Sequence, residues 1–384
     1  MWYTSRVCEE YSPARQGCQT TKMGDPQPTS CAHPRLDRSV ITFPLGIPGR
    51  TVAFQGQTSE MIGSEGLIAV HMEGNKHLTS QPNTHTMPDR DIPLAPEEDH
   101  RHPLEPNEHE AFYFPFTSPD GTVFGFIRTL FDRDAVLELV ALHIGGRTWV
   151  HQQHAPLPDG QVRVTDASGS SLTLTCREPW QAWCCSFHST VRQVSGEKAS
   201  LAELDLDFAA TGPPARYSFG PYQQAQQDGR LSGRLQIAAE QWTGELICYR
   251  DHSWGQRPMG AAARWTIASV PGHFYVVIIE MGDQQVYFGQ LTTPDSQFIP
   301  VHTPRLAAVG EGWRLDDPDA GMGTWHVKRL VAPLVAYLGP AGEEAFRDAP
   351  RPGDLYLDEI GPALFISPGG EQFVGLLDQA RRLT

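Results

Sequence analysis

The chain has 384 residues, more than one hydrophobic core usually supports, so we expect two domains. Its formal net charge of -15 argues against binding to nucleic acid, which needs clustered Lys and Arg to neutralise phosphates, and against anchoring on an anionic membrane. Apolar residues make up 40% of the chain, while 36 glycines and 32 prolines predict many turns and few helices.

Residues 1–36 mix Gln, Thr, Ser, Pro and Asp without apolar periodicity, which predicts a disordered leader. The N-terminal residues contain no apolar segment of the secretory type, and no apolar run of about 18 residues occurs. We therefore expect a cytoplasmic protein without a transmembrane segment. The seven cysteines form no CxxC pair of metal-binding spacing, so we expect reduced thiols.

From residue 111 onward, short β-branched or aromatic runs such as AFYFPF, TVFGFIRTLF and AVLELVALHI alternate with Gly, Asp and Ser turns. A second series of this kind follows the turn-rich stretch at residues 211–221. Both series are typical of antiparallel meanders, which close into barrels or sandwiches to hide their edges. We expect a mainly β protein with domains at 37–212 and 213–384. Only QFVGLLDQARRL, residues 372–383, fits a short helix.

The segment WTGELICYRDHSWG, residues 242–255, brings together several side chains that can carry charge or transfer a proton. Strand alternation would place Asp251 on one face and His252 with Trp254 on the other, at a strand end where barrel mouths hold ligands. Burial in an apolar pocket raises the pKa of an aspartate, and a neighbouring histidine can replenish its proton. We predict that Asp251 and His252 are the catalytic acid and base, in a site suited to protonating an alkene.

Aromatic and polar side chains around this segment are the predicted substrate-binding residues. Aromatic faces stabilise a developing cation. Glu280 and Gln290 interrupt apolar strands, and a buried carboxylate needs a partner such as Arg257 or Arg264. The predicted set is Trp242, Tyr249, Arg250, Trp254, Trp265, Tyr275, Glu280 and Gln290.

Two alternative interpretations concern the same charged residues. In the first, Arg250 and Asp251 form a structural ion pair that stabilises a turn, and Trp254 packs in the hydrophobic core. The stretch from Glu97 to Glu110 is rich in His and carboxylates, which suit Zn or Fe, but its prolines favour a solvated acidic loop. We expect no metal and no cofactor.

RDHSWGQRP, together with the upstream EDHRHPLEPNEHEAFYFPF and the later PWQAWCCSF, resembles the AttH-like and hydroxyneurosporene-synthase (carotenoid 1,2-hydratase) superfamily of calycin-like proteins. The resemblance covers residues 90–384. It implies two consecutive lipocalin-like β-barrel domains, with the DH-x-WG signature in the second. It also implies that Asp251 and His252 act as acid and base, that Trp254 forms a pocket wall, and that no redox cofactor takes part.

The function expected from these observations is a hydratase, cyclase or isomerase acting on a hydrophobic isoprenoid- or polyketide-like substrate. Two alternatives are a non-catalytic lipid or pigment carrier and a pericyclic, Diels-Alderase-like cyclase. The expected partner is a hydrophobic small molecule, taken up through transient membrane contact by a monomer or homodimer.

Overall fold

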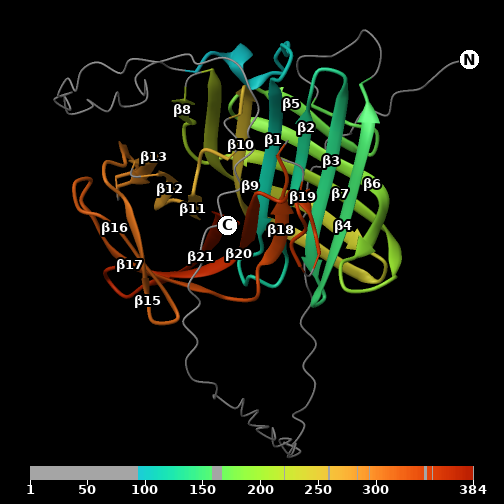
Figure 1. Cartoon of the computed structure of the whole chain (residues 1–384). Helices are drawn as coiled ribbons and strands as arrows, with labels where there is room; N and C mark the ends of the chain where they lie inside the picture. The colour runs from blue at the N-terminus through green and yellow to red at the C-terminus, as the bar shows by residue number, and fades with distance from the viewer. Residues whose placement is uncertain are drawn as a thin grey trace, which may run out of the picture. The chain divides into compact units, whose positions relative to one another are not determined.

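The computed structural model describes residues 94–157, 167–219, 221–257, 260–282, 284–293, 295–340, 344–347 and 349–383. These residues form two curled antiparallel sheets, shown in Figure 1 in green to yellow and in orange to red. Apart from a 3-10 turn at Pro96–Asp99, the regular elements are strands, which confirms the predicted mainly β fold. The described part of the chain contains no helix long and apolar enough for a membrane span. The predicted leader lies outside it.

The first sheet closes into a barrel because β9 pairs with both β7 and β10. Closure leaves the strands of the ring without free edges. Strands β5 (Leu172–Glu178) and β8 (Ala215–Phe219) extend the sheet along β6 and β9. The ring consists, in order, of β10 (Glu240–Gly255), β1 (His109–Thr117), β2 (Phe124–Phe131), β3 (Ala135–Ile144), β4 (Arg147–Pro156), β6 (Ala182–Gln193), β7 (Ala199–Ala210) and β9 (Tyr222–Ile237).

In the second sheet, the described end strands β14 and β15 do not pair with each other. Strand β18 (Leu334–Leu338) pairs with the first half of β20 and with β19 (Glu344–Ala345), while β17 pairs with the second half of β20. The main order is β14 (Phe298–Pro300), β13 (Gln284–Thr292), β12 (Phe274–Met281), β11 (Arg264–Val270), β21 (Gln372–Arg382), β20 (Tyr356–Ile366), β17 (Met322–Arg329), β16 (Gly312–Asp317) and β15 (Arg305–Val309).

The helix predicted at residues 372–383 is wrong, because this stretch forms strand β21. It lies between β11 and β20, so its backbone is hydrogen-bonded on both sides. Its middle residues from Gly375 to Asp378 are buried on both faces of the sheet. A strand buried on both faces has a continuous apolar run instead of alternation, and such a run resembles a short helix.

The strand that carries DHSWG lies in the first sheet, whereas we expected it in the second barrel. Strands β9 and β10 form one long hairpin, and the chain enters the second sheet only after Gly255, at Arg264. The hairpin belongs to the first sheet because β9 pairs with β7 and β10 pairs with β1, which completes the ring. As the limits of independently folding units, 37–212 and 213–384 remain a prediction.

Apolar clusters occupy the barrel interior, one face of the second sheet and the junction between the two sheets. The barrel interior contains a core that includes Phe112, Phe114 and Trp183, and one face of the second sheet covers a core around Trp325 and Phe365. Two further clusters join the barrel's outer wall to the second sheet. One contains Tyr217, Tyr222, Tyr249, Ile267, Tyr275 and Val277, and the other contains Phe124, Phe126, Leu139, Leu334 and Ile360.

We expect Gly233→Ala to destabilise the barrel. Gly233 in β9 has φ +150°, and a Cβ there would overlap the carbonyl oxygen of Asp205 on the paired strand β7. The expected loss is about 2–4 kcal/mol in the free energy of unfolding, measured by urea denaturation. Gly310→Ala is the matched control, because Gly310 also has a positive φ but no heavy atom lies within 4 Å of the added Cβ. Equal losses in both variants would contradict the steric explanation.

Candidate functional site

Strand β10 separates two environments, because its successive side chains point to opposite faces of the barrel wall. Arg250 and His252 point inward, and each is at most 1% exposed. Asp251 and Ser253 point outward and line a pocket shared with the second sheet. The predicted acid and base therefore lie on opposite sides of the wall and do not face a common ligand.

Inside the barrel, Arg250 is paired with Asp99. Its Nη1 donates to Oδ2 of Asp99 at 3.1 Å and its Nη2 donates to Oδ1 at 2.5 Å. The same carboxylate accepts the backbone N–H of Trp180 at 2.6 Å and the indole N–H of Trp183 at 3.0 Å. The Arg250 guanidinium lies 4.9 Å from the centre of the Trp180 ring. The ion pair predicted for Arg250 thus exists, but with Asp99 instead of Asp251.

A second inward group joins His252 to Glu110 and His102. The Nε2–H of His252 donates to Oε1 of Glu110 at 2.9 Å, and the Nδ1–H of His102 donates to the same oxygen at 2.7 Å. Burial alone would raise the pKa of Glu110, but the hydrogen bonds from the two histidines hold it below its usual value. Burial lowers the pKa of His252. Trp254 stacks on His102, with ring centres 4.5 Å apart, and so belongs to this group.

His102, Glu110 and His252 are also the group of described residues that could hold a metal ion, because their ligand atoms lie within 4.8 Å of one another. Two imidazoles and a carboxylate suit zinc. Binding would require both imidazoles to release the protons that they donate to Glu110. It would also leave Nδ1 of His252 without the outer partner that metal-bound histidines usually have. The contacts therefore favour a hydrogen-bonded group that fastens the segment before β1 to the barrel end, and the absence of a metal stays a prediction.

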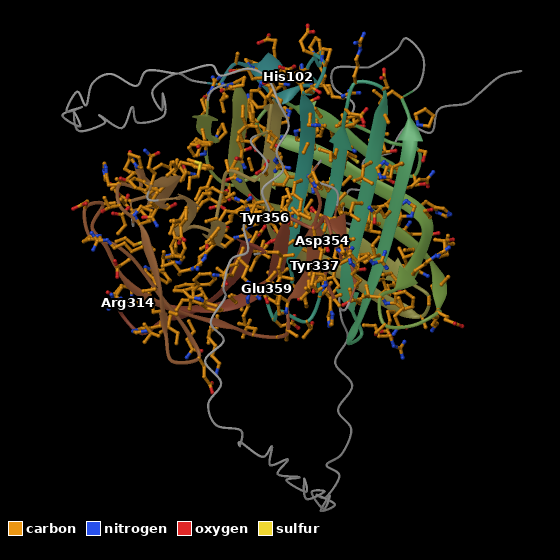
Figure 2. The ribbon with its side chains drawn as sticks, in the orientation of Figure 1. His102, Arg314, Tyr337, Asp354, Tyr356 and Glu359 are labelled. Atoms are coloured by element: carbon orange, nitrogen blue, oxygen red, sulfur yellow. The ribbon has the colours of Figure 1, made fainter. Side chains whose placement is uncertain are left out.

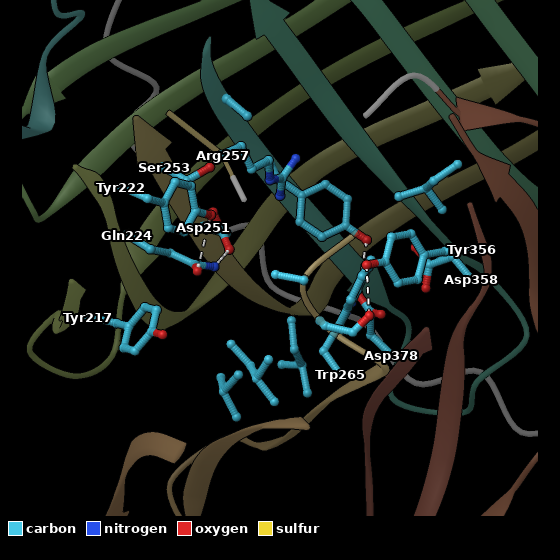
Figure 3. Close-up of a pocket in the computed structure, with 18 of the residues that line it drawn as sticks. Tyr217, Tyr222, Gln224, Asp251, Ser253, Arg257, Trp265, Tyr356, Asp358 and Asp378 are labelled. Atoms are coloured by element: carbon cyan, nitrogen blue, oxygen red, sulfur yellow. Dashed lines mark hydrogen bonds between the residues drawn. The ribbon is translucent and has the colours of Figure 1, made fainter. Parts of the chain in front are cut away.

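The pocket lies between the outer wall of the barrel and the second sheet. Its cavity has a volume of about 140 Å³, similar to cavities that bind a small apolar molecule, and it opens to solvent. Figure 3 shows its polar groups, and Figure 2 shows that the pocket residue Tyr356 lies away from His102 at the barrel end. The second sheet and the segment beside it supply most of the apolar lining, namely Ala261, Ala262, Trp265, Ile267, Val277, Ile279, Met281 and Leu338.

Asp251 is held at the pocket wall by two glutamines. The side-chain amide of Gln224 donates to its Oδ2 (Figure 3), and the amide of Gln226 donates to the same oxygen at 2.5 Å. Burial raises the pKa of Asp251, although the Gln226 amide and the positive charge of Arg257 oppose this rise. In the β9–β10 register, Gln226 lies opposite Asp251 and Gln224 lies opposite Ser253. All four side chains therefore lie on the same outward face of the sheet, where both glutamines can reach Asp251.

Asp358 and Asp378 form a carboxyl pair in the pocket. Asp378 stands opposite Ile360 in the β20–β21 register, so Asp358 is its diagonal neighbour on the same face. Burial raises the pKa of Asp378 to about 6, while burial and the Asp378 carboxylate raise the pKa of Asp358 well above its usual value. Asp358 therefore keeps its proton to higher pH than Asp378, and the two carboxyl groups are hydrogen-bonded to each other.

Two tyrosines from the barrel wall support the ionised member of this pair. The hydroxyl of Tyr249 donates to Oδ2 of Asp378 at 3.0 Å, and that of Tyr113 donates to the same oxygen at 3.4 Å. Tyr249 lies two residues before Asp251 on the outward face of β10. The barrel wall thus orients a carboxylate of the second sheet, and the site depends on both sheets.

The predicted substrate-binding residues fall into three groups. Trp265 lines the pocket, and Tyr249 and Tyr275 pack in the cluster beside it. Arg250 and Trp254 belong to the inward groups. Trp242 packs against the barrel core, Glu280 pairs with Arg264 at 3.8 Å with 39% of its side chain exposed, and the Gln290 amide donates to the carbonyl of Pro213 at 3.2 Å.

We did not predict the carboxyl pair from the sequence. Asp358 and Asp378 each interrupt an apolar stretch, as YLDEI and LLDQA show, which is the signal that drew attention to Glu280. The helical interpretation of residues 372–383 hid Asp378. Asp99 and Glu110 were assigned to a solvated acidic loop, yet both side chains are fully buried.

We expect Asp99→Asn to cost about 3–5 kcal/mol of folding free energy, because it leaves the buried Arg250 guanidinium without a counter-charge. Asp205→Asn is the control. Asp205 also pairs with an arginine, Arg234, at 2.9 Å, but both side chains are more than half exposed and the loss should not exceed about 1 kcal/mol. Chemical denaturation measures both variants. A loss for Asp99→Asn no greater than for the control would show that the buried pair is not needed for stability.

The chain was compared with known families, curated proteins and solved structures. The family described as a domain of unknown function (DUF7064) matches residues 95–301, more than half of the chain. No curated protein matches the sequence. An AttH structure from Nitrosomonas europaea is similar with a TM-score of 0.55 and 14% identity, covering 75% of this chain and 97% of that one. This match confirms the resemblance in fold to AttH-like two-barrel proteins.

Two further solved structures are similar at lower scores. Kievitone hydratase from Nectria haematococca has a TM-score of 0.47 and 12% identity, covering 78% of this chain and 96% of its own. The protein CghA has a TM-score of 0.41 and 11% identity, covering 73% of this chain and 90% of its own.

Proposed function

We propose that this chain, which belongs to the family described as a domain of unknown function (DUF7064), is an acid–base enzyme that protonates a carbon–carbon double bond. Its substrate is hydrophobic, and the reaction is a hydration, cyclisation or isomerisation. One observation carries the proposal: the buried carboxyl groups of Asp358 and Asp378 are hydrogen-bonded to each other in a largely apolar pocket, and this environment raises the pKa of both. An uncharged acid that is stable at pH 7 is the group that proton donation to an alkene requires.

The carboxyl pair begins and ends the reaction with one proton. Asp358 gives its proton to one alkene carbon, the π electrons form the new C–H bond, and the other carbon becomes a cation. In a hydration, water forms a C–O bond to this cation and loses a proton to the carboxylate pair. In a cyclisation, a second double bond attacks the cation to form a C–C bond, and the new cation then loses a proton from an adjacent carbon to the pair. In an isomerisation, the first cation loses such a proton directly to the pair. Net charge and proton count are restored in each case.

Groups around the pair fit the charge that develops. The Asp378 carboxylate stabilises a cation, and the ring faces of Trp265 and Tyr356, whose centres lie 4.8 Å apart, offer cation–π contact. The apolar wall limits the entry of water, which would decide between hydration and ring closure. Burying two carboxyls without a reaction to serve would only destabilise the fold. This argues against a simple carrier.

Asp251 is the less suitable proton donor. Two amide N–H groups donate to its Oδ2, and such bonds stabilise the ionised form of a carboxyl group. Asp358, in contrast, faces an ionised carboxylate that stabilises its protonated form. His252 lies on the other face of β10 and cannot return a proton to Asp251 directly.

We expect Asp358→Asn to lower the rate by about 100-fold to 10,000-fold, because the amide cannot donate a proton to carbon. The measurement incubates purified protein with a hydrophobic extract of its source cells in D2O and uses mass spectrometry to find products that have gained deuterium at carbon. Glu359→Gln is the control, since its carboxylate is adjacent in sequence but does not line the pocket. Unchanged turnover in Asp358→Asn would refute this role, and selective loss in Asp251→Asn would move the donor to Asp251.

The reaction should have a bell-shaped pH profile. Asp378 has its pKa raised to about 6, so the rate should fall as pH drops through this value and the accepting carboxylate is protonated. The rate should fall again at alkaline pH, where Asp358, whose pKa is raised further, loses its proton. Because an uncharged substrate does not titrate, initial rates from pH 4 to pH 10 report the carboxyl pair. An acidic limb that persists in Asp378→Asn would assign that limb to another group.

A further inference from the structure

We infer that the pocket binds an uncharged amphiphile, a hydrophobic chain with a hydroxyl group at one end, and that this hydroxyl contacts Asp251 and Arg257. The inference rests on the proposed function, because it takes the same pocket as the substrate site. It adds the chemical class of the substrate and the residues that select it.

The pocket has a polar end built on the barrel wall and the segment that follows it. Asp251 uses Oδ2 for both glutamine amides, while Oδ1 has no hydrogen bond among the described residues. Tyr222 donates to Gln224 at 3.2 Å and also contacts Ser253 and Arg257. A hydroxyl group fits here because it can donate to Oδ1 of Asp251 and accept from the Arg257 guanidinium. A pure hydrocarbon would desolvate these groups without replacing their hydrogen bonds.

The charges of the lining disfavour an anionic ligand. Four carboxyl groups, those of Asp251, Glu344, Asp358 and Asp378, line the pocket with only two guanidinium groups, those of Arg128 and Arg257. Arg128 is already paired with Glu344, and Arg257 is attracted to Asp251. A carboxylate or diphosphate would therefore enter a pocket whose cations are compensated and whose remaining charge is negative.

The polar end and the carboxyl pair are separate. Figure 3 shows Asp251 with Tyr222, Gln224 and Ser253 on one side of the pocket and Asp358 with Asp378 and Tyr356 on the other. The apolar residues of β11 and β12 line the space with them. A substrate anchored by its hydroxyl at Asp251 would extend its chain along this wall. Its reacting double bond would then lie away from the hydroxyl, near Asp358.

The test compares four ten-carbon probes of closely related skeleton: geraniol, geranic acid at pH 8, geranyl diphosphate and the hydrocarbon myrcene. Binding to the full chain is followed by displacement of Nile red, an uncharged fluorescent dye. We expect geraniol to bind at least 10-fold more tightly than each of the other three. Equal or tighter binding of the acid, the diphosphate or the hydrocarbon would overturn the inference.

Variants assign the preference to named groups. Asp251→Asn and Arg257→Gln should each weaken geraniol binding about 10-fold, and either variant alone suffices if the other fails to fold. Glu359→Gln should bind geraniol as the unsubstituted chain does. Undiminished geraniol binding in the two pocket variants would overturn the assignment.

The inference and the proposed function fail separately. Asp358→Asn removes the proton donor but no charge, so it should retain the preference for geraniol while turnover is lost. If the unsubstituted chain shows no preference but Asp358→Asn still abolishes turnover, only the substrate class is wrong. If the preference holds while Asp358→Asn remains active, the preference stands and acid catalysis by Asp358 is wrong.

Discussion

The two-residue alternation of β10 in the barrel wall is the constraint on which the rest of the structure depends. Because neighbouring side chains point to opposite faces, one short sequence serves two unlike environments. Inward, Arg250 and His252 each meet a buried carboxylate, Asp99 and Glu110. Outward, Tyr249 and Asp251 face the second sheet. Alternate residues of one strand therefore hold the barrel end together on one face and line the pocket on the other.

The inward groups explain how polar residues are tolerated inside a barrel otherwise filled with apolar side chains. A buried charge is stable only when it is paired and hydrogen-bonded, and Asp99 meets this condition with one guanidinium and two N–H donors from tryptophans. Asp99 and His102 lie before β1 in the sequence. Their contacts with β10 therefore fasten this segment across the barrel end, a structural role for the histidine and tryptophan of the DH-x-WG signature.

The outward pocket exists because the two sheets meet at two apolar clusters with polar groups between them. The carboxyl pair comes from β20 and β21, while its tyrosine donors come from β1 and β10. Neither sheet alone would give Asp378 its environment. Desolvation by the joined sheets raises the pKa values of both acids, and the Asp378 carboxylate raises that of Asp358 further. The raised pKa values of Asp358 and Asp378 therefore depend on the contact between the two sheets.

The sequence by itself determined the β class, the turn-bounded strands and the likeness to two-barrel proteins, because period-two patterns and turn residues act locally. It also placed Asp251 and His252 on opposite faces. Only the tertiary structure decided that Arg250 pairs with Asp99, that β21 is a strand and that Asp358 meets Asp378. Arg250 and Asp99 lie 151 positions apart, and β21 is held on one side by β11, more than 100 positions earlier in the chain. Local sequence carries no record of such a partner, since burial and charge environment arise only when distant strands pack together.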